Sequence, residues 1–160
     1  MSKKHILVDI ILVTLKRELE ALTQSALAAH AAATHEESKA EDSHDTRGLE
    51  ASYLAVAQGT RIEALKKTIS TYQFLPIRDF GPNDPIAVGA LVELELNGTK
   101  SCYFLVSQSG GQTTLLEGKP VQVITPQAPL GEALLGRRLG DTVEVEGKHV
   151  SREYEITGVE

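Results

Sequence analysis

The sequence predicts an α+β protein, in which an antiparallel helical hairpin (a coiled coil) precedes an antiparallel sheet domain with one short helix. In the first half, apolar residues recur every three or four positions, as they do on one face of a helix. In the second half, they alternate with polar residues, as they do in half-buried strands. Four proline and glycine residues separate the two patterns, at Pro76, Gly81, Pro82 and Pro85. We therefore expect a hairpin over 1–76, a linker over 77–85 and a sheet domain over 86–160.

The first helix is predicted from about residue 6 to residue 42, a length of about 55 Å at 1.5 Å per residue. Its evidence is a seam of apolar and small residues whose spacings alternate between three and four, which is typical of a coiled coil. The seam consists of Leu12, Leu15, Leu19, Leu22, Ala26, Ala29 and Ala33. A partner helix is therefore expected along this face.

The second helix supplies that partner. The same spacing continues through Ala51, Ala55, Ile62, Leu65, Ile69 and Tyr72, and only Gln58 interrupts it. Gly59 weakens this helix by about 1 kcal/mol, so packing against the first helix must hold it. The turn falls around residues 43–48, directly after the stretch HEESKAEDSHD, residues 35–45, with its five carboxylates and two histidines.

The strands of the second half are marked by alternation and by turn residues. ALVELEL and SCYFLVS flank Asn97-Gly98, the strongest short signal for a β-hairpin. Further strands are expected at VQVIT, DTVEVEG and SREYEITGV, with a short helix at GEALLG between them. This half is expected to form a sheet domain of about 80 residues.

Composition excludes several classes of protein. The net charge of −6 argues against a broad nucleic-acid surface, and direct contact with duplex DNA stays an open and less favoured alternative. Lys16, Arg17, Lys66 and Lys67 form either a small basic patch for RNA or a solvated helix base. The single cysteine, Cys102, excludes an internal disulfide. The first apolar run is interrupted by Asp9 and is too short to span a bilayer, which predicts a cytoplasmic protein without membrane contact.

Residues 128–145, APLGEALLGRRLGDTVEV, closely resemble the signature of the C-terminal domain of the bacterial transcript cleavage factors GreA and GreB. The closing YEITGVE fits their last strand, and LKRELEAL and RIEALKKTI resemble parts of their two long helices. The resemblance implies an FKBP-like second domain that docks at the rim of the RNA polymerase secondary channel. It also implies that the hairpin enters this channel, and that the protein is an accessory factor with no enzymatic activity of its own.

The resemblance also implies site residues at the hairpin tip. Counted along the first helix, the acidic positions of the family fall on Asp42 and Asp45, with Glu41 as a third candidate. A spacing of three residues places two carboxylates on one helix face or around one tight turn. The expected metal is Mg²⁺, which the chain does not bind alone but shares with the polymerase active site, beside the 3′ end of the nascent RNA. Carboxylate oxygens suit this hard cation.

In the second domain, Pro129 and Leu130 match the family positions that contact the polymerase rim, and Gln127 and Ala128 precede them. The alternative is an ordinary turn that leads into the short helix. Prolyl isomerase activity is not expected, because the domain has no tryptophan and few aromatic residues to form the pocket, and a shared fold does not carry function with it.

Three other functions stay open for the acidic tip. The first is a solvated turn without a specific role. The second is an independent metal site of His35, Asp42, His44 and Asp45, although no recognisable ligand spacing supports it. The third is a regulator without cleavage activity, which occupies the channel and inhibits transcription. The resemblance favours stimulated, Mg²⁺-dependent cleavage of backtracked RNA over these alternatives.

Overall fold

The computed structural model describes residues 1–34 and 47–160, which form two compact units. Leu12–Ser70 form the hairpin unit, whereas Met1–Ile11 and Thr71–Glu160 together form the sheet unit. The first turns of the N-terminal helix therefore belong to the sheet unit. In the described part of the chain, no helix combines the length and the apolar character needed to cross a membrane.

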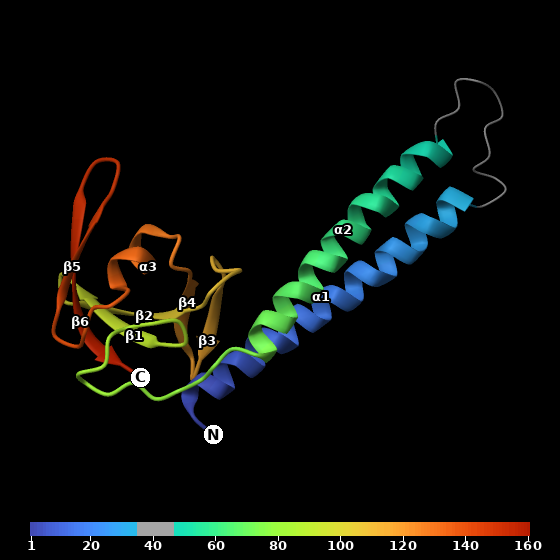
Figure 1. Cartoon of the computed structure of the whole chain (residues 1–160). Coiled ribbons are helices and arrows are strands. Elements are labelled where there is room, and N and C mark those ends of the chain that lie inside the picture. Colours follow the sequence, from blue (N-terminus) through green and yellow to red (C-terminus); the bar gives the residue numbers. More distant parts are fainter. Residues whose placement is uncertain (35–46) are drawn as a thin grey trace. The chain divides into compact units, whose positions relative to one another are not determined.

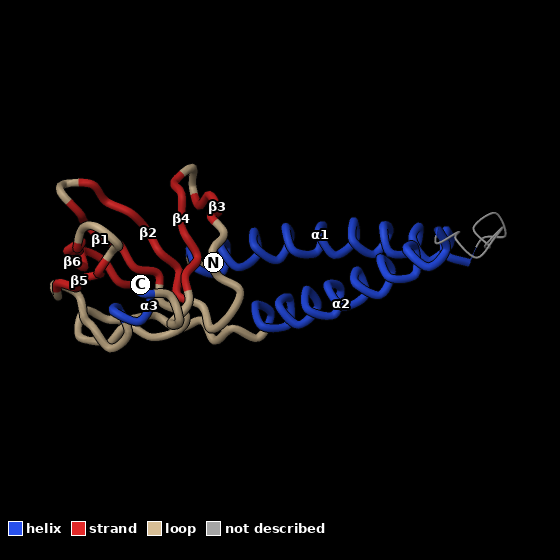
Figure 2. The backbone as a smooth tube through the Cα atoms, turned by 90° about the horizontal axis from the view of Figure 1, so that it is seen from above, coloured by secondary structure: helices blue, strands red, loops and turns tan. Residues whose placement is uncertain are grey.

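The hairpin is built from α1 (Lys3–Thr34) and α2 (Arg47–Gln73), which run side by side in opposite directions (Figures 1 and 2). The predicted seam is confirmed by burial. Along α1 from residue 12 to residue 30, the half-buried positions include every predicted seam residue of that stretch, and most of the intervening positions are exposed. Along α2, Ala55, Ile62 and Leu65 are half-buried and Ile69 is buried, so the helices pack along the expected faces.

Gln58 lies in this seam and is buried. Its Nε2 donates a hydrogen bond to Ser25 Oγ on α1 at 2.6 Å. Its Oε1 is buried as well, without a hydrogen-bond partner in the described residues. A buried polar side chain at a seam position favours one register of two helices at a cost in stability. Gln58 thus fixes which residues of α1 and α2 face one another.

The sheet has six strands in the order β3-β4-β2-β1-β6-β5. The strands are β1 (Leu91–Leu96), β2 (Thr99–Leu105), β3 (Thr113–Leu116), β4 (Lys119–Ile124), β5 (Thr142–Glu146) and β6 (Ser151–Val159). Helix α3 (Pro129–Leu134) lies between β4 and β5 in the chain. Five of these strands and the helix agree with the prediction, whereas β3 was not predicted.

Two tight turns of the same kind close hairpins of this sheet. Asn97 and Gly98 have φ of 52° and 79°, and join β1 to β2 where Leu96 pairs with Thr99. Glu117 and Gly118 have φ of 51° and 77°, and join β3 to β4. Positive φ at both central residues matches the twist of the flanking strands.

One strand pair corrects the prediction of an antiparallel sheet. Strand β4 runs parallel to β2, while the other neighbouring strands of the sheet are antiparallel. Residues 106–112 cross the end of the sheet and start β3 one strand position further out. Strand β4 then returns into the gap between β3 and β2, in the direction of β2.

The core of the sheet unit lies between one face of the sheet and the segments that cover it. Val92, Leu94 and Ile156 from the central strands pack with Leu134 of α3 and with Phe80, all of them buried. Ile86, predicted as the first residue of the sheet domain directly after the linker, is held by the turn that follows α3. Ile86 N donates to Arg137 O at 2.7 Å, and Gly136 N donates to Ile86 O at 2.9 Å.

Lys4 anchors the first turn of α1 within the sheet unit. It is 1% exposed, its Nζ donates to the carbonyl oxygen of Arg78, and it lies 4.9 Å from the centre of the Phe80 ring. The Arg78 guanidinium lies 4.0 Å from the centre of the same ring. Burial lowers the pKa of Lys4 below its ordinary value of 10.5, because it penalises the charged form.

Candidate docking surface at the start of helix α3

The predicted tip residues and the predicted docking residues have different outcomes. Glu41, Asp42 and Asp45, with His35 and His44, lie outside the described residues. Within residues 1–34 and 47–160, no three His, Cys, Asp or Glu side chains gather closely enough to hold a metal ion. The geometry of a candidate site therefore comes from the other predicted segment, Gln127–Leu130.

A tight turn places this segment at the start of α3. Ala128 N donates to Thr125 O at 3.0 Å, and Glu132 N then donates to Ala128 O at 2.9 Å. Ala128 is the N-cap residue, with an extended backbone at φ −74° and ψ 146°. Pro129 occupies the first helical position, where its missing N–H costs nothing and its fixed φ suits the helix.

Gly131, in the first turn of α3, lies directly against the backbone of Thr125. A Cβ at this position would lie 2.0 Å from Thr125 O and 2.7 Å from Thr125 C. Only glycine permits such a close approach of two backbone segments. The turn and α3 therefore behave as one rigid piece, and the residues between Thr125 and Gly131 are held in a fixed presentation.

The four predicted docking residues differ in what they present to solvent. Gln127 and Pro129 are exposed, and Ala128 and Leu130 are half-buried. Leu130 also packs against the core of the sheet unit. Gln127 and Pro129 are therefore the residues of this segment that are most available to a partner, and Leu130 contributes to both the core and the surface.

A groove of about 600 Å³ adjoins the turn. It is lined by residues 107–111 after β2, by 122–125 at the end of β4, and by Gln127 and Ala128. We call it the glutamine groove, because Gln108, Gln122 and Gln127 are exposed around it. Sequence reasoning did not find it; the available signal was the uncharged stretch SQSGG that directly follows a strand.

The loop on one side of the groove is held by Tyr72, near the end of α2. Tyr72 is 1% exposed, its hydroxyl donates to Ser109 O at 3.1 Å, and Gln112 Nε2 donates to that hydroxyl at 2.9 Å. Burial raises the pKa of Tyr72 above its ordinary value, so the hydroxyl keeps the proton that it donates. Ser109 has a φ of 60°, which is uncommon for a residue with a side chain.

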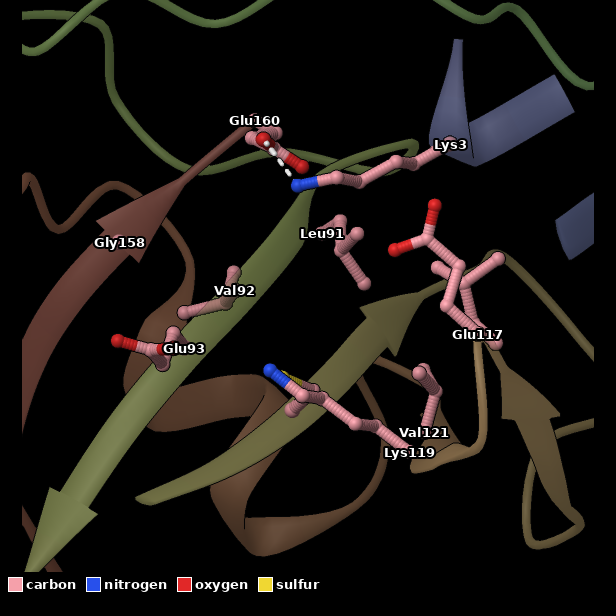
Figure 3. Close-up of a pocket in the computed structure, with 11 residues that line it drawn as sticks. Lys3, Leu91, Val92, Glu93, Glu117, Lys119, Val121, Gly158 and Glu160 are labelled. Carbon is pink, nitrogen blue, oxygen red and sulfur yellow. Dashed lines mark hydrogen bonds and ion pairs between the residues drawn. The ribbon is translucent and has the colours of Figure 1, made fainter. Parts of the chain in front are cut away.

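A second cavity, of about 220 Å³, is lined by residues of β1, β2, β3, β4 and β6, together with Lys3, Glu117 and Glu160 (Figure 3). Among its charged lining residues, Lys3 pairs with Glu160, and Glu93 pairs with Lys100, which lies outside the lining. Lys3 Nζ lies 3.2 Å from Glu160 Oε1, and Lys100 Nζ lies 3.1 Å from Glu93 Oε1. Thr157 Oγ1 also donates to Glu93 at 2.9 Å. The first pair joins the start of α1 to the residue that follows β6, and the contacts of Glu93 link β1 to β2 and β6.

Cys102 lines the same cavity and is half-buried. Burial raises the pKa of its thiol, and the nearby carboxylate of Glu93 adds to this effect. A raised pKa lowers the fraction of thiolate, which is the reactive form. Both effects favour the protonated thiol of Cys102 over the thiolate.

The chain is similar to known proteins. A family model described as "Transcription elongation factor, GreA/GreB, C-term" matches residues 81–160. The transcription inhibitor protein Gfh1 of Thermus thermophilus is 31% identical over 121 residues, which cover 74% of this chain and 73% of that protein. The transcription elongation factor GreA of Methylococcus capsulatus is 27% identical over 101 residues, which cover 62% and 60%. A crystal structure of Gfh1 from Thermus thermophilus covers 93% of this chain and 94% of that chain, at 23% identity and a TM-score of 0.39.

The fold and the rigid turn define a two-unit protein with a paired-helix arm and a mixed sheet that presents a fixed loop. The matched region contains the whole sheet, the turn and α3. The chain belongs to the GreA/GreB family of transcription elongation factors.

Proposed function

We propose that this protein binds RNA polymerase and stimulates the Mg²⁺-dependent cleavage of backtracked RNA. The observation that carries the proposal is the family match over residues 81–160, which includes the predicted docking segment. The acidic stretch at residues 35–45, between α1 and α2 in the chain, supports the cleavage role. In this proposal the chain is an accessory factor, and the polymerase supplies the nuclease active site.

Docking uses the segment Gln127–Leu130. Gln127 and Pro129 are exposed, and the close approach of Gly131 to Thr125 fixes their positions before a partner arrives. A rigid loop loses little conformational freedom on binding, which favours affinity. The polymerase rim is the partner surface that the resemblance implies for this segment.

The chemistry depends on the carboxylates at the tip. Asp42 and Asp45, with Glu41 as a third oxygen donor, supply ligands that suit Mg²⁺. When bound, Mg²⁺ activates water and stabilises the charge on the leaving oxygen of a phosphodiester. The role of these side chains is to complete the coordination of an ion that the polymerase alone holds weakly.

The second candidate function is inhibition of transcription without cleavage. The observation that favours it is the similarity to Gfh1 of Thermus aquaticus and Thermus thermophilus, which is named a transcription inhibitor protein. The alignments with Gfh1 cover 74% of this chain, whereas the alignment with GreA of Methylococcus capsulatus covers 62%. In this alternative, the helical hairpin occupies the secondary channel and blocks the passage of substrates.

One assay separates the two functions. Purified elongation complexes, backtracked and carrying RNA labelled at the 5′ end, are mixed with the protein, and RNA length is followed with time. Cleavage predicts shortened RNA with the wild-type chain, and loss of shortening with the double variant Asp42→Asn/Asp45→Asn. Glu36→Gln/Glu37→Gln is the matched control, because it removes the same charge from the same stretch and should leave shortening intact.

Slower RNA synthesis without shortened RNA would support inhibition in place of cleavage. An equal loss of shortening in the double variant and in its control would contradict the assignment of Asp42 and Asp45. It would indicate that the total charge of the tip matters, and not the position of two carboxylates.

A further inference from the structure

The glutamine groove is lined by small, apolar and uncharged polar residues. None of the described residues that line it carries a charge, whereas 24% of the residues of the chain are charged. Depletion of charged residues is one feature of the centre of a protein interface. In this one respect the groove resembles such a centre.

Its hydrogen-bonding groups come from three separate segments. Gln108 belongs to the loop after β2, Gln122 to β4, and Gln127 to the turn before α3. Each exposed side-chain amide offers both a donor and an acceptor. Three such groups around one hollow suit a partner segment that carries hydrogen-bonding groups and no net charge.

The walls of the groove are fixed before anything binds. Tyr72 holds Ser109 from one side, and the Gly111 N–H donates to Val123 O at 2.8 Å. Gly110 packs so closely on the end of β4 that a Cβ there would lie 2.9 Å from Thr125 Cγ2. Because Thr125 also begins the docking turn, the loop and the turn are parts of one rigid surface.

We propose that the glutamine groove is a second part of the surface that docks on RNA polymerase, and that it receives an uncharged segment of the polymerase protein. This inference rests on the proposed function. It is supported by the continuity of the groove with Pro129 through Gln127 and Ala128. RNA is not the expected occupant, because affinity for its phosphate backbone comes mainly from lysine and arginine, which the lining lacks.

The test measures binding of the full chain to immobilised core RNA polymerase, free of nucleic acid, by biolayer interferometry. Gln122→Glu places a charge in the groove with almost no change of shape and should raise the Kd about tenfold, since the charge loses water without a partner. Asn97→Asp is the matched control. It adds the same charge in the exposed β1–β2 turn, outside the groove, where aspartate is well tolerated.

A second variant tests the support of the loop. Tyr72→Phe removes the hydroxyl that holds Ser109. It should speed the hydrogen exchange of residues 107–111 and raise the Kd for polymerase, whereas Asn97→Asp should change neither quantity. An unchanged Kd in Gln122→Glu, or an equal rise of the Kd in Asn97→Asp, would overturn the proposal that the groove binds polymerase. It would not affect the separate proposal that the segment Gln127–Leu130 does. The measurement is repeated with polymerase that carries RNA. If Gln122→Glu weakens binding only to that complex, the occupant of the groove is a nucleic acid and the proposal is overturned. Absence of wild-type binding would overturn the proposed function as well.

Discussion

The contact of Gly131 with Thr125 gives the sharpest prediction about how the docking segment is held. In Gly131→Ala, the new Cβ would lie 2.0 Å from a backbone oxygen, whereas real Cβ atoms essentially never approach closer than 3.0 Å. The turn and α3 must therefore move apart by about 1 Å. Extra atoms in a tightly packed site cost about 1–3 kcal/mol, and here the opposing atoms are backbone, so we expect the upper part of that range.

For a chain of this size, 3 kcal/mol lowers Tm by about 6–12 °C. Thermal unfolding followed by near-UV circular dichroism measures the change through the tyrosines. Gly59→Ala is the matched control, since the same atom is added inside α2 with nothing within 4 Å. Alanine is a better helix former than glycine, so this variant should stabilise the hairpin by about 1 kcal/mol. A Gly131→Ala protein as stable as the wild type would refute the close approach.

Three further substitutions test individual interactions. Gln58→Leu should stabilise the hairpin by about 1 kcal/mol, because it removes a buried oxygen that has no hydrogen-bond partner in the described residues. Urea unfolding followed by the circular dichroism of the helices measures the change. A destabilised variant would contradict the burial of this side chain between α1 and α2. Lys4 binds its proton less tightly in the folded chain, so the free energy of unfolding of the wild type should rise with pH between the folded pKa of Lys4 and 10.5. Lys4→Met should abolish that rise. A rise that persists in this variant would exclude Lys4 as its source. The hydroxyl of Thr157 and the ammonium of Lys100 lower the pKa of Glu93 below its ordinary value of 4.5. Glu93→Gln should therefore lower the free energy of unfolding by about 0.2–1 kcal/mol at neutral pH, and this loss should vanish as acid protonates Glu93 in the wild type. A loss of stability that does not change with pH would argue against the ion pair.

The helical seam was predictable because it depends on local periodicity alone. The spacing of three and four residues places Leu15 and Leu19 on one face whatever the partner is, and both are half-buried in the structure. Gln58 interrupts the pattern in the sequence, yet lies in the same seam, because a single hydrogen bond to Ser25 permits its burial. The pattern thus identified the face but not the polar contact within it.

The sheet was predictable where turns carry their own signal. Asn97-Gly98 predicted its hairpin correctly, whereas Glu117-Gly118 forms a similar turn that escaped notice because β3 is short. The parallel pairing of β4 with β2 depends on where residues 106–112 carry the chain, and alternation contains no information about that. Strand direction therefore had to come from the structure.

The docking segment and the groove show the same division. Pro129 and Leu130 were found through the family signature, but the rigidity of their turn depends on a backbone contact between Gly131 and Thr125. The groove joins the loop after β2 to the end of β4 and the turn that follows, and Tyr72 supports the loop across 37 positions of the chain. Sequence periodicity assigned Tyr72 to the helical seam and could not reveal its hydrogen bond to Ser109.

The most direct test of the central claim is the Mg²⁺ dependence of RNA shortening in backtracked elongation complexes. If Asp42 and Asp45 complete the coordination of a weakly held ion, the wild-type protein should lower the Mg²⁺ concentration needed for half-maximal shortening, and Asp42→Asn/Asp45→Asn should restore the value of polymerase alone. The same half-maximal concentration with and without the wild-type protein would contradict the account.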